Sequence, residues 1–391
     1  MMSLKGKNEL VGAVQPRYLK AGKFEKQKIL DEFTAATGYH RKHAIRVLKN
    51  KVQVQNRLKG KTKTYRRVYR GEVVQALEQI WEIYGRICSK RLQPFLPEAI
   101  RVLERCQEIE LSKDTKDLLL KISSASIDRC LRPIRFQTSH GLSTTKPGSL
   151  LKNLIPIRTF TEWDAERPGF LEIDLVAHCG NTTEGQFLCT LTCTDLCTGW
   201  TEVTGLLHRS QEAVSEALRQ MRQRLPFPLL GIDSDNGGEF INDLLYQYCL
   251  DEKITFTRSR PYKKNDQAHV EHTCPGGRCQ GKNWSVVRHT VGYDRWETEQ
   301  ELALLESIYD DLRLYVNFFQ PSRKLIAKER IDNKTLKRYD TAKTPYQRVL
   351  DRKDISLQAK ARLVILYLQL NPAELRRCID LKTAKLWKTS R

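Results

Sequence analysis

The order of apolar patterns between residues 169 and 258 constrains the fold more than any other feature of this sequence. Three apolar or alternating runs come first, separated by turns that contain glycine: GFLEIDLVAH, GQFLCTLTCTDL and GWTEVTGLL. Such runs predict β-strands, and their short connections predict an antiparallel meander. A helix (SQEAVSEALRQMRQRL), a buried strand (PLLGIDSD), a second helix (GEFINDLLYQYCLDEK) and a strand (ITFTRSRPY) are expected to follow. The order predicts an α/β domain with a mixed five-stranded sheet and helices.

The first part of the chain has helical periodicity instead. Two short helices are expected about Thr37-Gly38, and their inward residues are Ile29, Phe33, Ala36, Ala44, Ile45 and Leu48. The outward residues of the second helix are basic, namely Arg41, Lys42 and Arg46. This pattern indicates a helix-turn-helix unit, although a helical hairpin with solvated lysines would look similar. A second such unit is predicted in DTKDLLLKISSASIDRCLRPIRF, with Ser124 as the N-cap of its second helix.

Composition changes along the chain suggest four regions. We predict a helical DNA-binding region with two helix-turn-helix units at 1–136 and a linker rich in Ser, Thr, Gly and Pro at 137–164. The α/β domain is expected at 165–320, and a basic C-terminal region at 321–391.

The net charge of +21 is unevenly distributed. Residues 1–150 carry 31 basic and 14 acidic side chains (+17), residues 151–250 carry 7 and 14 (−7), and residues 251–391 carry 29 and 18 (+11). Basic flanks around an acidic centre indicate a polyanion such as nucleic acid, with solvated basic surfaces as the alternative. No secretory signal and no apolar run of membrane-spanning length are apparent, so a cytoplasmic, nucleoid-associated protein is expected.

The cysteines of such a protein should be mostly reduced. Cys189, Cys193 and Cys197 are spaced four apart, which differs from common structural zinc motifs. Positions four apart on a strand share one face, so buried thiols are expected there.

Three carboxylates occupy chemically informative positions. Asp174 is inside an apolar strand, where an unpartnered charge is costly, Asp235 follows the buried fourth strand, and Glu271 is expected on a helix that begins near Asn265. In a ribonuclease H-like sheet the first and fourth strands are neighbours, so the three carboxylates should converge. Such carboxylates repel one another unless divalent cations lie between them. Two Mg²⁺ ions about 4 Å apart can activate an attacking oxygen and stabilise a leaving oxygen.

The spacing of these residues resembles a known family. Sixty residues separate Asp174 from Asp235 (235 − 174 − 1), and 35 separate Asp235 from Glu271 (271 − 235 − 1). With DSDNGGEF and RPYKKNDQAHVE, this is similar to the D,D-35-E core of retroviral integrases and many bacterial insertion-sequence transposases. The resemblance implies that Asp174, Asp235 and Glu271 are the catalytic residues and the ligands of two Mg²⁺ or Mn²⁺ ions.

The same resemblance implies partners as well as chemistry. The expected activity is cleavage and transfer of DNA strands at the ends of a mobile element, by a homo-oligomer assembled on double-stranded element-end and target DNA. No membrane partner is expected. Residues near the site that could contact DNA are Lys263, Lys264 and Asn265.

Other acidic residues nearby have different expected roles. Asp233 would be 37 residues from Glu271 (271 − 233 − 1), which departs from the family spacing. Glu172 shares a strand face with Asp174. It could support the metal site, but we expect its side chain to be exposed to solvent instead. Asp195 precedes a TGW turn, and we expect it to cap that turn.

The sequence departs from the family after Glu271. In relatives the catalytic Glu is followed closely by Gln-Lys-Asn-Trp, whereas HTCPGGRCQG intervenes here before Lys282. Pro275 and the two glycines predict that the helix ends near Thr273. The insertion has three interpretations: a solvated loop of a catalytically impaired copy, a tolerated loop that contacts DNA, or a zinc clamp. The candidate zinc ligands are His269, His272, Cys274 and Cys279.

Three functions are compatible with these sequence features. The first is an active DNA transposase, and the second is a transposase-derived DNA-binding protein whose site is impaired. The third is a ribonuclease H-like nuclease that only hydrolyses, which leaves the two helix-turn-helix units without a role.

Overall fold

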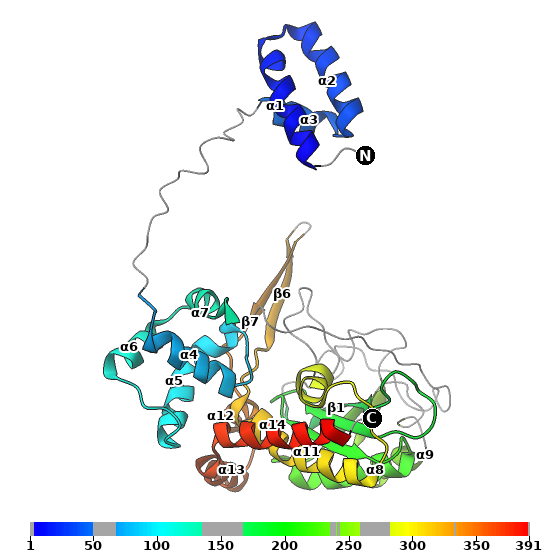
Figure 1. Cartoon of the computed structure of the whole chain (residues 1–391). Helices are drawn as coiled ribbons and strands as arrows, with labels where there is room; N and C mark the ends of the chain where they lie inside the picture. Colours follow the sequence, from blue (N-terminus) through cyan, green and yellow to red (C-terminus); the bar gives the residue numbers. More distant parts are fainter. Residues whose placement is uncertain are drawn as a thin grey trace. The chain divides into compact units, whose positions relative to one another are not determined.

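The computed structural model of the protein describes residues 4–49, 68–134, 167–234, 240, 243–258, 282–331 and 334–389. Contacts between Cα atoms divide the chain into two units, residues 1–68 and 69–391 (Figure 1). The two predicted helix-turn-helix pairs thus belong to different units, and the predicted region boundaries remain predictions. Among the described residues, no helix is both long and apolar enough to cross a membrane.

Among its described residues, the first unit contains three helices around a small core. They are α1 (Leu4–Lys20), α2 (Lys23–Thr37) and α3 (Arg41–Lys49). The helix α2 ends at Gly38, whose φ of 68° is left-handed and whose N–H donates to the carbonyl of Thr34 at 2.9 Å. Glycine adopts this conformation without a Cβ clash, so the sequence correctly located the turn.

Two details of this unit differ from the sequence prediction. Ala36 was expected to face inward, but it is exposed, and Thr37 is the buried residue next to it. The helix α1 was not predicted as a separate element, and it contains Pro16. Its Val11 and Tyr18 belong to the core that α2 and α3 share.

The second unit contains the predicted mixed sheet. Its strands are β1 (Phe170–Ala177), β2 (Cys189–Asp195), β3 (Thr201–Leu206), β4 (Gly231–Ser234) and β5 (Thr255–Arg258). They are ordered β3-β2-β1-β4-β5, with β1 antiparallel to β2 and parallel to β4. The meander, the helix-strand-helix-strand order that follows it and the pairing of the first strand with the fourth were predicted, and the fold is ribonuclease H-like.

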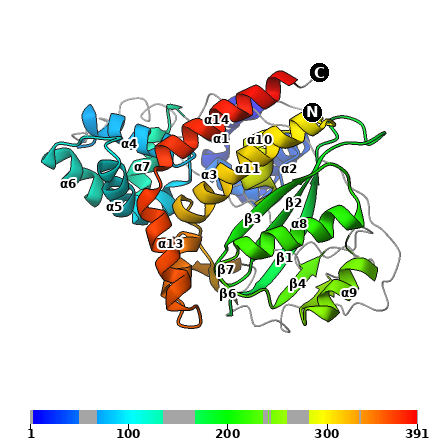
Figure 2. The same ribbon diagram turned by 90° about the horizontal axis from the view of Figure 1, so that it is seen from below.

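Helices pack on both faces of the sheet (Figure 2). On one face, the Sγ of Cys193 lies 3.2 Å from the Sδ of Met221 in α8 (Gln211–Arg224), which itself packs on α9 (Asp243–Asp251). On the other face, the hydroxyls of Thr190 and Tyr309 are 2.5 Å apart, and Tyr309 belongs to α11 (Glu299–Phe319). The sheet is thus the middle of three layers, which explains why β2 and β3 are buried along their whole length.

Two local predictions about this sheet are confirmed. Cys189, Cys193 and Cys197 are buried, as predicted, although Cys197 lies beyond the end of β2 and does not share its strand face. Asp195 caps the turn after β2, because its carboxylate accepts from the N–H and hydroxyl of Thr198, both at 2.6 Å, and from the N–H of Gly169 at 2.8 Å.

The edge strand β3 is bound by side chains of α11. The amide of Asn317 accepts from the N–H of Thr201 at 2.8 Å and donates to its carbonyl at 2.7 Å. Glu306 accepts from the N–H of Gly205 in the same strand. Glu202 is fully buried and pairs with Arg313 at 2.6 Å and with Arg224 at 3.4 Å.

In residues 69–134 of the second unit, a described stretch that precedes the sheet, there are four helices. They are α4 (Glu72–Ile83), α5 (Ser89–Arg105), α6 (Lys113–Lys121) and α7 (Ser124–Leu131). The predicted second helix pair is α6 and α7, but its N-cap is Ser123 rather than Ser124. Ser123 has the extended backbone of a cap, and its hydroxyl accepts from the N–H of Ser126 at 3.2 Å.

The C-terminal region packs against these helices and the sheet. It contains a hairpin of β6 (Leu325–Ile331) and β7 (Lys334–Tyr339), followed by α12 (Pro345–Asp351), α13 (Leu357–Gln369) and α14 (Pro372–Thr389). An aromatic cluster joins α11 to α12 and α13, and it comprises Phe318, Phe319, Tyr346 and Tyr367. The hydroxyl of Tyr315 in α11 donates to the carbonyl of Ile83 at 2.6 Å, which ties α4 to the same body.

Candidate functional site

Asp174 is a buried carboxylate on the central strand of the sheet. Its side chain is in β1 and is only 7% exposed. One carboxylate oxygen accepts from the N–H of Leu175 at 2.8 Å, and the other accepts from the side-chain amide of Asn283 at 2.5 Å. Each carboxylate oxygen has two lone pairs, so these bonds are compatible with an additional cation. The contacts fix the orientation of this carboxylate.

The pairing of β1 with β4 is the most informative geometric feature of the site. The two strands are parallel, and the last pair in their register is Ile173 with Ser234. These residues immediately precede Asp174 and Asp235 in the sequence. The last pair of this parallel register therefore directly precedes two of the three predicted catalytic carboxylates in the sequence, of which Asp174 lies within β1 and Asp235 follows β4.

Two further carboxylates share this part of the sheet. Glu172 and Asp233 are paired in the register, and both are fully buried. The prediction that Glu172 is exposed is therefore wrong, because β1 is the central strand of a sheet that has helices on both faces. Asp233 accepts from the hydroxyl of Thr257 in β5 at 2.6 Å. Strand alternation places Glu172 on the same face as Asp174.

Several predicted site residues lie outside the described residues. They are Asp235, Lys263, Lys264, Asn265 and Glu271, and the candidate zinc ligands His269, His272, Cys274 and Cys279. Within the described ranges, no group of three or more His, Cys, Asp or Glu side chains is arranged to hold a metal ion. The roles predicted for these residues remain predictions.

Sequence reasoning assigned no role to a helical segment that supports Asp174. The π-helix η2 (Asn283–Arg288) contacts β1 at both of its ends. Asn283 donates to Asp174, and Arg288 donates to the carbonyl of Ala177 at 2.5 Å. π-Helical turns often occur at functional sites. The Lys-Asn-Trp motif after the insertion was the signal that could have identified Asn283.

A buried histidine immediately follows the strand β1. Burial and the nearby guanidinium of Arg288 lower the pKa of His178 to about 3. Its Nε2 is 2.7 Å from the hydroxyl of Thr190, which in turn contacts Tyr309 of α11. His178 is therefore neutral at physiological pH and links the end of β1 to α11, so it is a structural residue rather than a general acid.

The predicted DNA-contacting residues of the first unit are on α3. Arg41, Lys42 and Arg46 are all exposed, as predicted. Arg41 forms an ion pair with Asp31 of α2, and Arg46 lies 3.0 Å from the Nδ1 of His43. Exposed pairs of this kind contribute little to stability, so the guanidinium groups remain available to a phosphate backbone.

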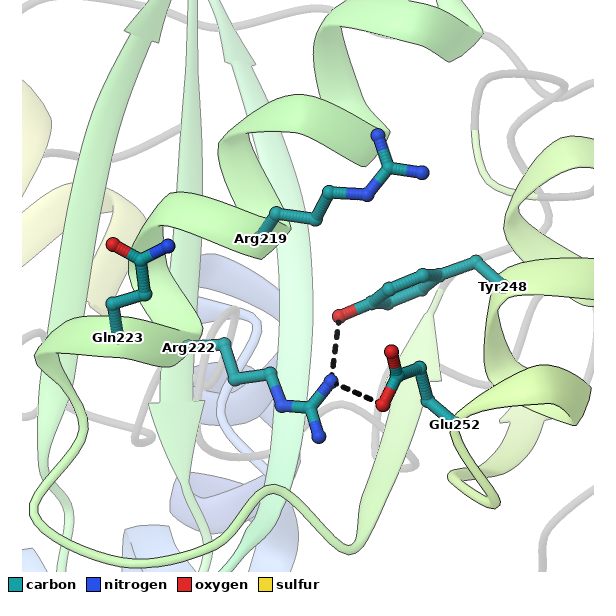
Figure 3. Close-up of a pocket in the computed structure, with 5 residues that line it drawn as sticks. All are labelled: Arg219, Arg222, Gln223, Tyr248 and Glu252. Carbon is teal, nitrogen blue, oxygen red and sulfur yellow. Dashed lines mark hydrogen bonds and ion pairs between the residues drawn. The ribbon is translucent and has the colours of Figure 1, made fainter.

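A surface pocket of about 460 Å³ lies between α8 and α9, and it has no buried carboxylate comparable to Asp174 (Figure 3). Its lining residues are Arg219, Arg222, Gln223, Tyr248 and Glu252. Arg222 is 2.8 Å from the carboxylate of Glu252 and 3.4 Å from the hydroxyl of Tyr248. The charge of the Arg222 guanidinium is thereby balanced by Glu252, and the contacts join the two helices rather than form a reactive site.

Comparison with known proteins gives two findings. Residues 164–264 match the integrase core domain family, a range that contains Asp174 and Asp235. The chain is also 41% identical, over 349 residues, to the uncharacterized protein y4rM of Sinorhizobium fredii (strain NBRC 101917 / NGR234). That similarity covers 89% of this chain and 96% of y4rM. Together with the sheet order, these findings show that the chain belongs to the family of y4rM and to the retroviral integrase-like superfamily that includes the DDE transposases.

Proposed function

We propose that the protein is a metal-dependent polynucleotidyl transferase, a transposase that cleaves DNA at the ends of a mobile element and joins them to target DNA. The protein would be cytoplasmic and nucleoid-associated, with double-stranded DNA as its substrate. Its active form would be a homo-oligomer assembled on that DNA. Membership of the integrase core family supports DNA cleavage and transfer in general.

The observation that carries this proposal is the parallel register of β1 and β4. Ile173 pairs with Ser234, and each immediately precedes a predicted catalytic aspartate. The 35 residues between Asp235 and Glu271 match the family spacing, and this identifies Glu271 as the third carboxylate. We assign Asp174, Asp235 and Glu271 as the ligands of the ions and as the catalytic residues.

The described part of the site fits a hard divalent cation. Mg²⁺ and Mn²⁺ prefer oxygen ligands, and Asp174 presents a carboxylate whose orientation two hydrogen bonds fix. When bound, two such ions would activate an attacking oxygen and stabilise the leaving oxygen of the phosphodiester. Asn283 holds the Asp174 carboxylate in position. Because Asp174 is buried, bulk water is largely excluded from this carboxylate.

The remaining roles concern DNA. The exposed basic residues of α3 would bind the duplex, and Lys263, Lys264 and Asn265 would contact it near the site. Clustered Lys and Arg side chains supply most of the non-specific affinity for DNA. Residues 1–150 have a net charge of +17. This charge is consistent with a DNA-binding role for the N-terminal part and a catalytic role for the sheet domain.

A cleavage assay tests the assignment. We expect Asp235→Asn to abolish Mg²⁺-dependent cleavage of linear DNA that carries the element's own terminal repeats, with DNA binding nearly unchanged. Asparagine keeps the size of the side chain but removes the charge that holds the cations. Asp243→Asn, at an exposed position in the first turn of α9, is the matched control and should cleave normally. A normal cleavage rate in the Asp235 variant would refute the metal-site assignment.

A second candidate function is favoured by one observation in the sequence. The insertion HTCPGGRCQG follows Glu271, whereas in the family that the sequence resembles the catalytic Glu is followed closely by Gln-Lys-Asn-Trp. If it displaces Glu271, the protein would bind DNA as a transposase-derived protein without cleaving it. Replacing the insertion by a single Gln tests this candidate, because activity that appears only in the shortened variant would show that the parent is impaired.

A further inference from the structure

Three half-buried basic residues from distant parts of the second unit come together near the C-terminal end of α11. They are Arg91 in the first turn of α5, Lys282, which directly precedes η2, and Arg348 of α12. We call them the cationic cluster. None of the three was assigned a role by the sequence.

Two hydrogen bonds bring α5 and α12 to this end of α11. The side-chain amide of Gln320, the residue after α11, donates to the carbonyl of Tyr84 at 2.9 Å. The connection from α4 to α5 therefore lies against it, and Arg91 follows in the first turn of α5. Arg348 donates to the carbonyl of Ser322 at 2.9 Å, two residues beyond Gln320.

The segment that contains Lys282 lies on the same face of the sheet as α11. Asp174 is the register partner of Thr192, and both share a face with Thr190. The hydroxyl of Thr190 contacts Tyr309 of α11, and the carboxylate of Asp174 contacts the first residue of η2. Consequently α11 and η2 cover neighbouring strands on one face.

The direction of η2 places Lys282 at the level where α11 ends. The first residue of η2 contacts Asp174 and its last contacts Ala177, so η2 runs alongside β1 in the direction of the strand. Lys282 precedes η2 and is therefore level with the first half of β1. At that level the register leads across β2 to Thr201, whose backbone is bound by Asn317 near the C-terminal end of α11.

The charged form of Lys282 is disfavoured by its surroundings. Burial, and then the guanidinium groups of Arg91 and Arg348, lower the pKa of this ammonium to about 8 from 10.5. Arg348 pairs with Asp340 at 2.6 Å. Within the part of the chain that the structure describes, Lys282 and Arg91 make no side-chain hydrogen bond or ion pair, and the Nε of Arg91 is buried. Three cations thus share one carboxylate among these residues.

A cluster of this kind is suited to an oxyanion. Buried cations are costly unless they are paired, and an anion between them would offset both desolvation and mutual repulsion. Guanidinium and ammonium groups with free donors match the oxygens of a phosphate. The family acts on DNA, and η2 also holds the Asp174 carboxylate. A DNA phosphate is therefore favoured over a free anion or an acidic protein segment.

We propose that Arg91, Lys282 and Arg348 form a binding site for one phosphate group of the DNA that enters the catalytic site. The three residues come from the N-terminal helices, the catalytic domain and the C-terminal helices of the second unit. A phosphate held by all three would fix the DNA strand relative to the sheet that carries Asp174. This inference rests on the proposed DNA-transferase function and names a contact with its substrate.

The test uses the full-length protein and a duplex that carries the element's terminal repeat. Binding is followed by fluorescence anisotropy in EDTA, so cleavage is not required. The cluster variant is Arg91→Gln with Lys282→Gln, and Arg348 is kept because it also holds Asp340. The control removes two exposed charges from α13 and α14, by Arg362→Gln and Lys385→Gln.

The expected result follows from counterion release. Loss of one phosphate contact should reduce the slope of log Kobs against log salt by about 0.9. Between about 50 and 200 mM salt, the parent and the control should then lose about 3.5-fold more affinity than the cluster variant. Thermal unfolding of the cluster variant should occur at the parent's temperature or higher, because the substitutions remove like-charge repulsion.

Neutral methylphosphonate groups, introduced at one DNA position at a time, locate the contacted phosphate. At that position the substitution should weaken binding of the parent and the control but not of the cluster variant, since the interaction is already lost. A slope equal to that of the control, or equal sensitivity of the variant and the control at every position, would overturn the proposal.

A free anion is distinguished from DNA by a separate measurement. Inorganic phosphate is added at constant ionic strength, and thermal unfolding of the parent and of the cluster variant is compared. If phosphate stabilises only the parent while the two proteins have the same salt slope with DNA, the cluster binds a free anion and the proposal is wrong.

The outcomes for the cluster and for the reaction can be separated. A protein that binds DNA through the cluster but does not cleave it would refute only the proposed function. A protein that cleaves DNA but whose cluster variant has an unchanged slope would refute only the phosphate site.

Discussion

The contact between Asn283 and Asp174 allows a direct test of how the site is held. Asn283→Ala removes the side-chain amide that donates to the Asp174 carboxylate at 2.5 Å. Hydrogen bonds to charged groups contribute about 1.5–3 kcal/mol, and 1.4 kcal/mol corresponds to a factor of ten. If the bond orients Asp174 during the reaction, the cleavage rate should fall by about 10–100-fold, as for other residues that orient metal ligands.

The assay measures the rate of strand cleavage over a range of Mg²⁺ concentrations. Asn283→Ala should require more Mg²⁺ for half-maximal activity, because a freely rotating carboxylate binds cations less well. DNA binding in EDTA should be unchanged. Asn283→Asp has the same shape but no donor, so it should be at least as impaired in Mg²⁺ dependence at neutral pH.

A matched control comes from the same unit. Asn371 makes the same kind of bond, from its amide to the carboxylate of Glu108 at 2.6 Å, in the connection to α14. Asn371→Ala should lose a similar amount of stability but keep the parent's Mg²⁺ dependence. If Asn283→Ala is destabilised yet cleaves with the parent's rate and Mg²⁺ dependence, Asn283 is a structural residue and the reasoning fails.

Three other outcomes are expected. Replacing the three exposed basic residues of α3 by Gln should weaken DNA binding and flatten its salt dependence, as measured by anisotropy, while thermal stability is unchanged. Glu202→Gln leaves two partly buried arginines without their counter-charge, so urea unfolding should show a loss of about 3–5 kcal/mol. The Arg377 guanidinium lowers the pKa of Glu108 to about 2 from 4.5, so this carboxylate stabilises the fold above pH 4.5 and loses that effect as the pH falls towards 2. Glu108→Gln should therefore cost about 1 kcal/mol at pH 6, a small value because Arg377 is exposed, and nothing at pH 2, by urea unfolding.

The sheet could be predicted from sequence because its signals are local. Each strand has its own alternating or apolar run, and short connections between runs limit how the strands can pair. The turns around Gly38 and Asp195 were also predictable, since each depends on one residue's backbone preference or hydrogen-bonding capacity.

The features that were missed depend on contacts between distant segments. Burial of Glu172 requires helices on both faces of the sheet, and alternation within one strand cannot show that. The bond from Asn283 to Asp174 joins residues 109 positions apart. The β6–β7 hairpin did have a local signal, namely the alternating sequence around Asp332-Asn333. The region was nevertheless predicted only as basic, because its charge was considered and its alternation was not.

The binding of α11 to β3 also affects how copies of this protein can associate. An exposed edge strand can pair with a strand of another molecule, and such pairing leads to sheet extension and aggregation. At β3, the amide of Asn317 makes both hydrogen bonds that a neighbouring strand would make with Thr201, and Glu306 binds the N–H of Gly205. Side chains of α11 therefore occupy the outer edge of β3 at Thr201 and Gly205, and this disfavours the addition of a strand from another molecule there.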